Sequence, residues 1–385
     1  MEFTLNEEQR MAQDSARRMV EREIDPILAR HDPDVPLPKD ATLEILQVCA
    51  RQGLTGARCP ESDGGSGLSA LTFGLMLEQM PPTAVWALGG QEVTISRIAM
   101  GGSPEQKERF LPALLAGKRI TCTGTTEPDA GSDPRSIRTT AIDDGDAWIV
   151  NGTKMWITNA AVCDVMMITT SVGRDEKGLS RMMRIIVDKD ESPFATRKIP
   201  TMGLRQGHLG EASFVNCRVP KRNVLGEVGD ASRVLTKTWI ANRPFMGLYA
   251  VHLAQKAYDA AREYASQRVQ FGGIIGGFQL VQELLADIAT SITTSRLLCY
   301  YALDAIDRGE RANHISAMAK RYAVAACHQA IGKAMEVHGA MGISVELGLE
   351  RLYRDARMIP IPDGTNQVLT LIEGREITGI PAYRH

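Results

Sequence analysis

The stretch Thr125-Thr126-Glu127-Pro128-Asp129-Ala130-Gly131-Ser132-Asp133 lies at the end of a threonine-rich run that starts at Ile120. Threonine is β-branched and favours strands, so we expect a strand to end in this loop. Hydroxyls and exposed amides at a strand end can hold the polar edge of a flat ligand. Pro128 and Gly131 are also turn residues, and composition alone favours an ordinary surface turn.

The residues that follow this loop predict a β domain. Asn151-Gly152 separates two β-type runs, Ala147–Val150 and Thr153–Thr158, and this pattern predicts a hairpin. Further strand candidates are Val165–Thr170, Met183–Val187 and Glu211–Cys217. We therefore expect residues 119–230 to form a middle β domain.

Both flanks of this domain have helical periodicity. Thr4 and Glu7 indicate a capping box before the first helix, and Pro26 permits a break in it. No proline occurs between residues 245 and 359, which fits long uninterrupted helices. The prediction is an α+β multidomain chain with an N-terminal helical domain (1–118), the middle β domain and a C-terminal helical bundle domain (231–385). Other helical patterns cover residues 42–53, 70–79, 104–115, 278–301 and 314–338.

The composition argues against a nucleic-acid-binding, membrane-spanning, secreted or metal-binding protein. The chain of 385 residues has 44 Lys+Arg and 46 Asp+Glu, a net charge of −2, so bulk attraction to nucleic acid or an anionic membrane is not expected. No apolar run reaches 18 residues, and the N-terminus lacks a secretory pattern. The seven cysteines show no CxxC spacing, which fits free thiols in a reducing, cytoplasmic setting. The scattered histidines predict no metal site.

Two more segments combine polar groups with glycines. In Tyr264–Gly272, Arg268 near a helix end can clamp a phosphate and Phe271 can stack on a purine, although a solvated helix end capped by glycine explains them as well. In the second segment, Asp363 stands between Pro362 and Gly364. An Asx turn explains most such aspartates, and a general base is the alternative.

The order and spacing of these segments resemble the acyl-CoA dehydrogenase family over essentially the whole chain. The matching motifs are Thr126-Glu127-Pro128-x-Ala130-Gly131-Ser132-Asp133, Lys154-Met155-Trp156-Ile157-Thr158-Asn159, Arg268-x-x-Phe271-Gly272 with Phe278-Gln279, and Arg354-Asp355-Ala356-Arg357 with Asp363-Gly364-Thr365. The resemblance implies a helical N-terminal domain, a central β-barrel-like domain and a C-terminal four-helix bundle. It also implies bound FAD, a homotetramer, an acyl-CoA substrate and electron-transfer flavoprotein as acceptor.

The resemblance assigns roles residue by residue. Thr126, Ser132, Trp156 and Thr158 match contacts to the isoalloxazine and ribityl parts of FAD, and Thr123 and Thr125 add hydroxyls to the same strand edge. Residues that match positions reaching the FAD of a neighbouring subunit are Arg268, Phe271 and Gln279, and further cofactor positions are Glu336, Thr365 and Gln367. On the substrate side the matches are Ser132, Arg243, Asp363 and Gly364, with Asp363 in the place of the usual catalytic Glu.

Asp363 is one methylene shorter than Glu, so its oxygens retreat by about 1.5 Å. A misplacement of ~1 Å can cost ~100-fold in rate. Asn242 occupies the position where some family members carry a relocated Glu, so Asp363 is the expected base. Alicyclic acyl-CoA dehydrogenases and nitroalkane oxidases also use Asp. This motivates the hypothesis that the substrate is a cyclic or branched short acyl-CoA, such as cyclohexane-1-carboxyl-CoA, whose bulk at Cα needs a shorter base.

At other positions this chain differs from the family pattern in the charge of its side chains. Glu336 stands where the family usually has Gln near the FAD pyrophosphate, and a carboxylate beside phosphates is unfavourable unless paired. Glu78 and Glu92 fall near the acyl pocket by resemblance, but solvated helix charges are the simpler interpretation. Val85 stands where glutaryl-type enzymes carry Arg, which argues against a dicarboxylic substrate.

The sequence leaves alternatives to a dehydrogenase open. One is a flavoprotein oxidase of the nitroalkane-oxidase type, and another is a non-catalytic FAD-binding partner subunit. The direction of reaction is also open, since some relatives work as enoyl-CoA reductases.

Overall fold

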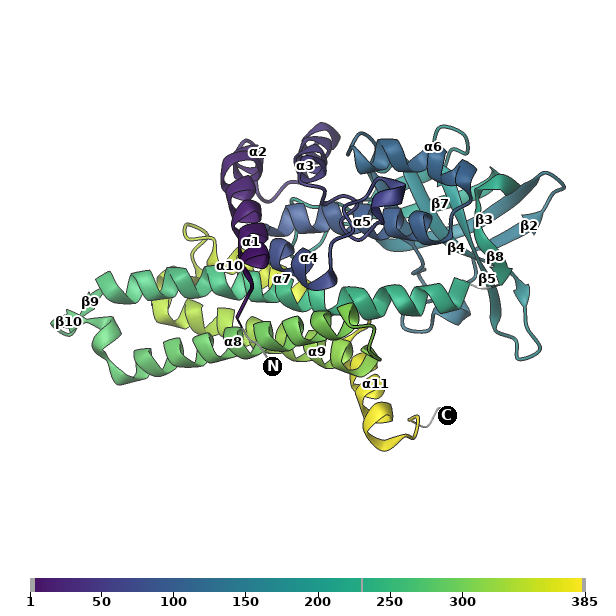
Figure 1. Cartoon of the computed structure of the whole chain (residues 1–385). Helices are drawn as coiled ribbons and strands as arrows, with labels where there is room; N and C mark the ends of the chain where they lie inside the picture. The colour runs from purple at the N-terminus through teal and green to yellow at the C-terminus, as the bar shows by residue number, and fades with distance from the viewer. Residues whose placement is uncertain (1–3, 230, 383–385) are drawn as a thin grey trace.

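The computed structural model describes residues 4–229 and 231–382, and it leaves the side chains of residues 232–237 undescribed. Figure 1 shows a helical N-terminal region, a central sheet and a helical C-terminal region in chain order. This arrangement confirms the predicted α+β fold class. No helix in the described part of the chain is long and apolar enough to cross a membrane.

The N-terminal region starts with a capped helix. Its helices are α1 (Glu7–Met19), α2 (Asp25–Ala29), α3 (Lys39–Arg51), α4 (Ala70–Leu77), α5 (Pro82–Gly101) and α6 (Pro104–Leu115). The predicted capping box at Thr4 and Glu7 is wrong, because Asn6 is the N-cap and pairs reciprocally with Gln9. Asn supplies the same side-chain oxygen to the free N–H groups of the first turn. A π-helical turn, Val20–Ile24, separates α1 from α2 just before Pro26.

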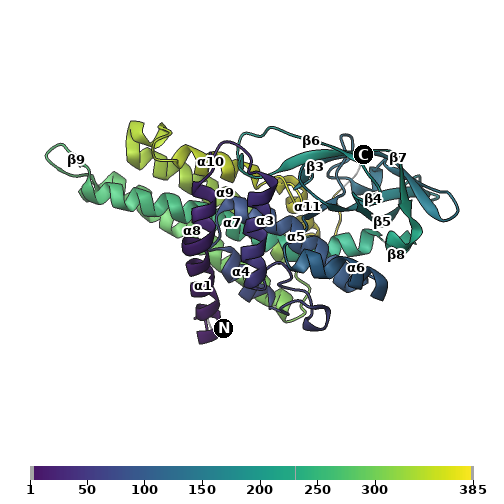
Figure 2. The same cartoon turned by 90° about the horizontal axis from the view of Figure 1, so that it is seen from above.

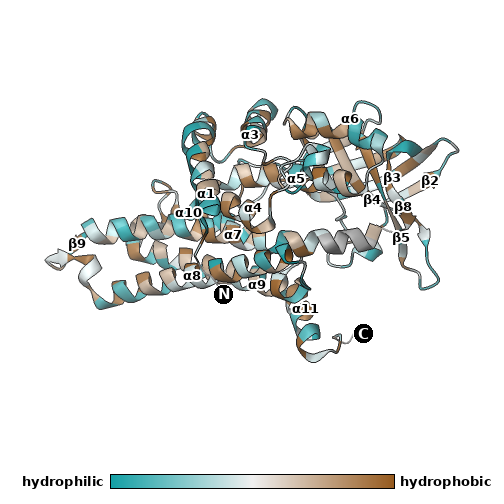
Figure 3. Cartoon of the chain, in the orientation of Figure 1, coloured by the Kyte–Doolittle hydropathy of each residue, from teal (hydrophilic) through white to brown (hydrophobic). Residues whose placement is uncertain are grey.

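The central region is one sheet of eight strands in the described residues. The strands are β1 (Thr121–Gly124), β2 (Thr140–Asp143), β3 (Ala147–Thr158), β4 (Val165–Arg174), β5 (Ser180–Asp188), β6 (Ala195–Lys198), β7 (Leu209–Pro220) and β8 (Val224–Gly229). Their order is β6-β7-β3-β2-β4-β5-β8, and β1 pairs with β4 in parallel. Figure 3 shows hydrophobic residues along the strands, which matches the nearly continuous burial of β4 and β5.

The predicted hairpin at Asn151-Gly152 is wrong. β3 continues through these residues, and its register against β7 shifts between Val150 and Gly152. Gly152 has φ 142°, and a Cβ there would lie 2.7 Å from the Cα of Thr139. Glycine therefore permits a close approach within a bulged strand, which is a second common use of glycine in β structure.

The C-terminal region contains α7 (Ala231–Gln267), α8 (Gln279–Asp307), α9 (Asn313–His338), α10 (Leu349–Met358) and α11 (Asn366–Thr378), with the short strands β9 (Val269–Gln270) and β10 (Gly273–Ile274) between α7 and α8. Figures 1 and 2 show α7, α8 and α9 side by side, with β9 and β10 at the end remote from the sheet. One apolar core runs through all three regions, from Ile45 and Leu88 to Met183 and Leu248. This core fixes the regions against one another.

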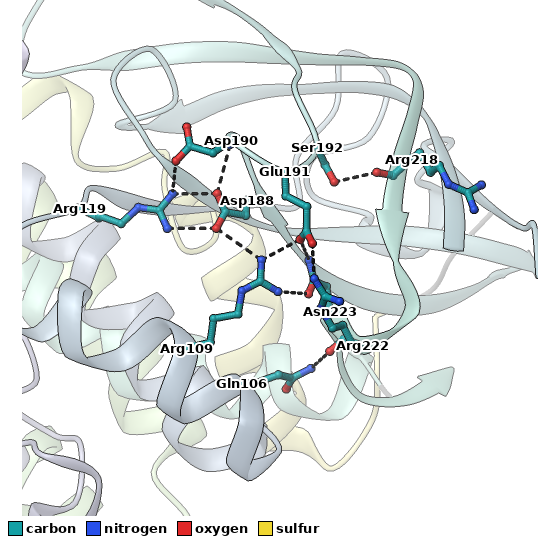
Figure 4. Close-up of polar contacts among 10 residues, drawn as sticks. All are labelled: Gln106, Arg109, Arg119, Asp188, Asp190, Glu191, Ser192, Arg218, Arg222 and Asn223. Carbon is teal, nitrogen blue, oxygen red and sulfur yellow. Dashed lines mark hydrogen bonds and ion pairs between the residues drawn. The ribbon is translucent and has the colours of Figure 1, made fainter. Parts of the chain in front are cut away.

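A network of charged residues joins α6 to the sheet (Figure 4). Arg119, just before β1, donates two hydrogen bonds to Asp188 at the end of β5, at 3.0 and 2.8 Å. Arg109 of α6 donates to Glu191 at 2.8 Å. Burial opposes the ionised form of Asp188, but the hydrogen bonds and charge of Arg119 outweigh it and lower the pKa of Asp188. The network therefore fixes the start of β1, the strand that carries Thr123.

Asp188→Asn should lower the free energy of unfolding by about 1–3 kcal/mol, because Arg119 then loses a largely buried anionic partner. Since the folded pKa of Asp188 is lowered, its contribution is present above the ordinary Asp pKa and is lost as pH falls through the folded value. Urea unfolding at pH 7 measures the effect. Asp190→Asn is the matched control, because the Asp190 side chain is 92% exposed and should change stability little. Equal effects of the two substitutions would contradict this assignment.

Candidate active site

The candidate base, Asp363, lies in the tight turn between α10 and α11. Its φ is 54°, in the left-handed region that non-glycine residues seldom adopt, and Gly364 follows with φ 100°. Thr365 then caps α11 through a hydrogen bond from the Val368 N–H to its hydroxyl at 3.3 Å. A backbone that departs from the common regions is frequent at functional sites, where the surrounding structure holds it in place.

Lys320 of α9 holds the Asp363 turn in place. This fully buried lysine donates to the carbonyl oxygens of Pro362 and Gly364, the second at 2.6 Å. Burial lowers the pKa of Lys320 to about 8, and the charge of Asp363 works in the opposite direction. One ammonium group therefore anchors both residues that flank Asp363.

Arg243 of α7 holds Asp363 itself. Its Nε donates to the Asp363 carbonyl oxygen at 3.3 Å, and its Nη1 donates to Asn313 Oδ1 at 2.9 Å. Burial raises the pKa of the Asp363 carboxyl, and the nearby charges of Lys320 and Arg243 oppose that rise. A raised pKa makes a carboxylate a stronger base, while nearby cations favour its ionised form.

Two further arginines lie close to this turn. Arg58 forms a two-pronged pair with Glu92 of α5, with Nε to Oε1 at 2.9 Å, and its Nη2 donates to Asn242 of α7 at 3.1 Å. Arg97 of α5 donates to the hydroxyl of Thr123 at 2.5 Å. The N-terminal region therefore brings positive charge close to Asp363. Sequence reasoning missed Arg58, Arg97 and Lys320, because helical periodicity gives no sign of which charged residues face inward.

The prediction that Glu78 and Glu92 are solvated is wrong. Both are buried, and each has a cationic partner from a distant segment. Glu92 pairs with Arg58, whereas Glu78 accepts from Arg296 of α8 at 2.7 Å and from the Tyr300 hydroxyl. A buried carboxylate needs such partners, which come from other helices and are invisible in the local sequence.

The loop that follows β1 is held by a buried ion pair. Lys154 of β3 contacts Glu127 Oε1 at 2.6 Å and the Thr125 carbonyl oxygen at 3.2 Å. Glu127 also accepts from the backbone N–H groups of Arg138 and Thr139, at 2.6 and 3.0 Å. Burial lowers the pKa of Lys154 to about 8. The pair fixes the end of the strand edge on which Thr123, Thr125 and Thr126 lie.

The second motif lies beside this edge. The backbone N–H of Met155 donates to the Thr126 carbonyl oxygen at 2.9 Å, so the β1 end and β3 are tied together. Trp156 has φ 61° at a register shift of β3, and 51% of its surface is exposed. A half-exposed indole at the rim of hydroxyl groups is suited to contact a flat ring. Thr158 ends the same strand, and Ser132 is exposed in the loop after β1.

The remaining candidates lie elsewhere in this chain. Arg268, Phe271 and Gln279 lie at the α7–α8 end, remote from the sheet in Figure 1. Phe271 is 98% exposed there. Glu336, near the end of α9, and Gln367, in the first turn of α11, are also exposed. The structure therefore gathers the candidates at the sheet edge and around Asp363, and leaves these five apart from them or facing outward.

The fold and site together define a three-region protein in which cations hold the Asp363 turn beside a hydroxyl-rich sheet edge. Three family models match the chain: the N-terminal domain of acyl-CoA dehydrogenase over residues 6–118, the middle domain over 122–217 and the C-terminal domain over 232–378. The chain belongs to the acyl-CoA dehydrogenase family. This result confirms the resemblance inferred from the motifs.

Individual relatives cover nearly the whole chain. Cyclohex-1-ene-1-carbonyl-CoA dehydrogenase of Geobacter metallireducens is 34% identical, over 97% of this chain and 98% of its own length. The caffeyl-CoA reductase–Etf complex subunit CarC of Acetobacterium woodii is 32% identical, over 95% and 97%. Among solved structures, the FAD complex of PigA matches with a TM-score of 0.91 and 26% identity, covering 98% of this chain and 99% of that one.

Lys154→Met should lower the free energy of unfolding by about 3–5 kcal/mol, because it leaves Glu127 charged and buried without its counter-ion. Lys154→Met combined with Glu127→Gln should recover part of this loss, since the remaining amide is neutral. Urea unfolding followed by circular dichroism compares the two. If the double variant is no more stable than the single one, the ion pair is not what fixes this loop.

Proposed function

We propose that the chain catalyses the FAD-dependent α,β-dehydrogenation of an acyl-CoA thioester, with Asp363 as the base. The observation that carries this proposal is the anchoring of the Asp363 turn. Lys320 binds the carbonyl on either side of Asp363, and Arg243 binds its own carbonyl. A base that must meet a weakly acidic C–H has to be fixed in position, and this anchoring does so.

The residues on the sheet edge fit FAD. Thr123, Thr125 and Thr126 present hydroxyl and backbone groups for the polar edge of the flavin, and Trp156 presents an exposed ring. Arg268, Phe271 and Gln279 would serve the FAD of a neighbouring subunit, and Glu336, Thr365 and Gln367 complete the proposed cofactor set. When bound, FAD supplies the two-electron acceptor that the reaction needs.

In the proposed step, the Asp363 carboxylate takes a proton from Cα of the thioester. The hydrogen at Cβ leaves with its electron pair to the acceptor, and a Cα–Cβ double bond forms. Arg243, Ser132 and Gly364 are proposed to orient the substrate. Burial raises the pKa of Asp363, which strengthens it as a proton acceptor, and the cations around it favour its ionised form.

The short side chain of Asp363 supports a cyclic or α-branched acyl group. The base stands about 1.5 Å further back than Glu would, which leaves room for a ring at Cα. The relative from Geobacter metallireducens, named for a cyclohexene-carbonyl thioester, is consistent with this preference. We propose cyclohexane-1-carboxyl-CoA as the model substrate for the site.

We also propose the partners and setting. Exposed apolar side chains such as Phe271, Leu280 and Val345 support self-association, for which a homotetramer is the proposed form. Electron-transfer flavoprotein is the proposed acceptor, in line with the complex for which the CarC relative is named. The seven cysteines are buried and free, which suits the reducing cytoplasm.

Asp363→Ala should reduce turnover of cyclohexane-1-carboxyl-CoA by at least ~100-fold, because the proton acceptor is gone. Asp363→Glu should shift preference toward butyryl-CoA, since the longer base occupies the space of the ring. Steady-state kinetics with a dye acceptor measures both. Full activity of the alanine variant would exclude Asp363 as the base. A clear wild-type preference for butyryl-CoA would contradict the cyclic substrate.

A further inference from the structure

Two guanidinium groups lie along one face of α7, next to the base. Arg97 donates from Nε to the Thr238 hydroxyl at 3.4 Å, and Arg58 donates to Asn242 Oδ1 at 3.1 Å. Thr238 and Asn242 are four residues apart, so they share one face of the helix. The next residue, Arg243, contacts Asp363. Cationic groups from α5, from the loop after α3 and from α7 therefore converge where the acyl group must lie.

Within the described part of the chain, Arg58 forms an ion pair with a carboxylate, whereas Arg97 and Arg243 do not. Glu92 pairs with Arg58 and also accepts from Ser96 at 2.7 Å, so its charge and oxygens are used. Arg97 is 3% exposed, and within the described residues it forms no ion pair and meets only hydroxyl oxygens. Arg243 and Lys320, both buried, meet amide and carbonyl oxygens.

Among the described residues, the positive charges around Asp363 therefore outnumber the negative ones. Arg97, Arg243 and Lys320 face a single unpaired carboxylate among the described residues, that of Asp363. Burial and the nearby charge of Arg184 lower the pKa of Arg97 to about 9, which still leaves it protonated at neutral pH. A buried cation without a counter-ion is costly. The arrangement is therefore suited to receive an anion.

The phosphate groups of FAD and of coenzyme A, the two proposed ligands, are not expected to lie beside Arg97. Arg97 contacts Thr123, which lies on the sheet edge proposed to meet the isoalloxazine and ribityl parts of FAD, and these parts carry no phosphate. Arg268, proposed to reach the pyrophosphate of a neighbouring subunit's FAD, lies at the far end of the α7–α8 pair (Figure 1). The phosphates of coenzyme A are separated from the thioester by the whole pantetheine arm, whereas Arg97 lies close enough to Asp363 to feel its charge. The acyl group is therefore the part of the proposed ligands that best suits an anionic group beside Arg97.

We propose that the acyl group of the substrate carries a carboxylate, which pairs with Arg97 while Arg58, fixed by Glu92, adds positive charge beside it. This inference rests on the proposed acyl-CoA dehydrogenation. It reverses the expectation drawn from Val85, which argued against a dicarboxylic substrate. Val85 is buried on α5, twelve residues before Arg97, so the same helix supplies a cation about three turns further on.

The test compares acyl-CoAs that differ by one carboxylate. The FAD-loaded enzyme is mixed anaerobically with each thioester, and flavin bleaching is followed. The three pairs, with the carboxylated member first, are glutaryl-CoA and pentanoyl-CoA, succinyl-CoA and butyryl-CoA, and 4-carboxycyclohexane-1-carbonyl-CoA and cyclohexane-1-carboxyl-CoA. We expect the second-order rate constant of bleaching to favour the carboxylated member of at least one pair by ~10-fold or more. Arg97→Gln should remove that preference, and Arg97→Lys should retain part of it.

Arg262→Gln is the matched control, because Arg262 lies on α7 with an exposed side chain and should leave the preference unchanged. Equal or better use of the neutral member of every pair by the wild type would overturn the proposal, even if Arg97→Gln fails to fold. An equal loss for both members in Arg97→Gln would also overturn it and assign Arg97 to coenzyme or flavin. If only the neutral thioesters bleach the flavin, the proposed dehydrogenation holds and the substrate carboxylate is rejected. If no thioester bleaches the flavin, both the dehydrogenation and the substrate carboxylate are rejected.

Discussion

The contact of the Lys320 ammonium with the carbonyl oxygens of Pro362 and Gly364 is the constraint on which the proposed chemistry depends. Asp363 has a backbone conformation that costs energy for any residue except glycine, and a loop between two short helices would not keep it unaided. A single buried cation from α9 fixes the carbonyls on both sides. Because α9 lies within the core shared by all three regions, the position of the base is tied to the whole fold.

The surroundings of Asp363 set its chemistry through two opposed effects. Burial raises the pKa of the carboxyl and strengthens it as a base, while Lys320 and Arg243 stabilise the ionised form. The N-terminal region adds Arg58 from the loop after α3 and Arg97 from α5, the first neutralised by Glu92 and the second contacting only hydroxyl oxygens within the described residues. The same charges that favour the ionised form of Asp363 could therefore also pair with the negative substrate group proposed above.

The sequence predicted the region order and the motif segments, because periodicity and turn residues report local structure directly. It was wrong where a residue has two common uses: Asn151-Gly152 forms a bulge in a continuous strand and not a hairpin, because Thr139, just before β2, approaches Gly152 closely. It also could not show which charges are buried. Glu92 and Lys320 become informative only when Arg58 and the 362–364 turn are brought to them from distant segments.

The most direct test of the central claim is exchange of the α-hydrogen of a bound 3-thia-acyl-CoA with solvent deuterium, followed by mass spectrometry. This thioester separates removal of the α-proton from loss of the β-hydrogen, so exchange reports the base alone. We predict exchange by the wild-type enzyme that rises with pH to a plateau, with a midpoint above the ordinary Asp pKa of about 3.9, and no exchange by Asp363→Asn. Exchange by Asp363→Asn at the wild-type rate would contradict it.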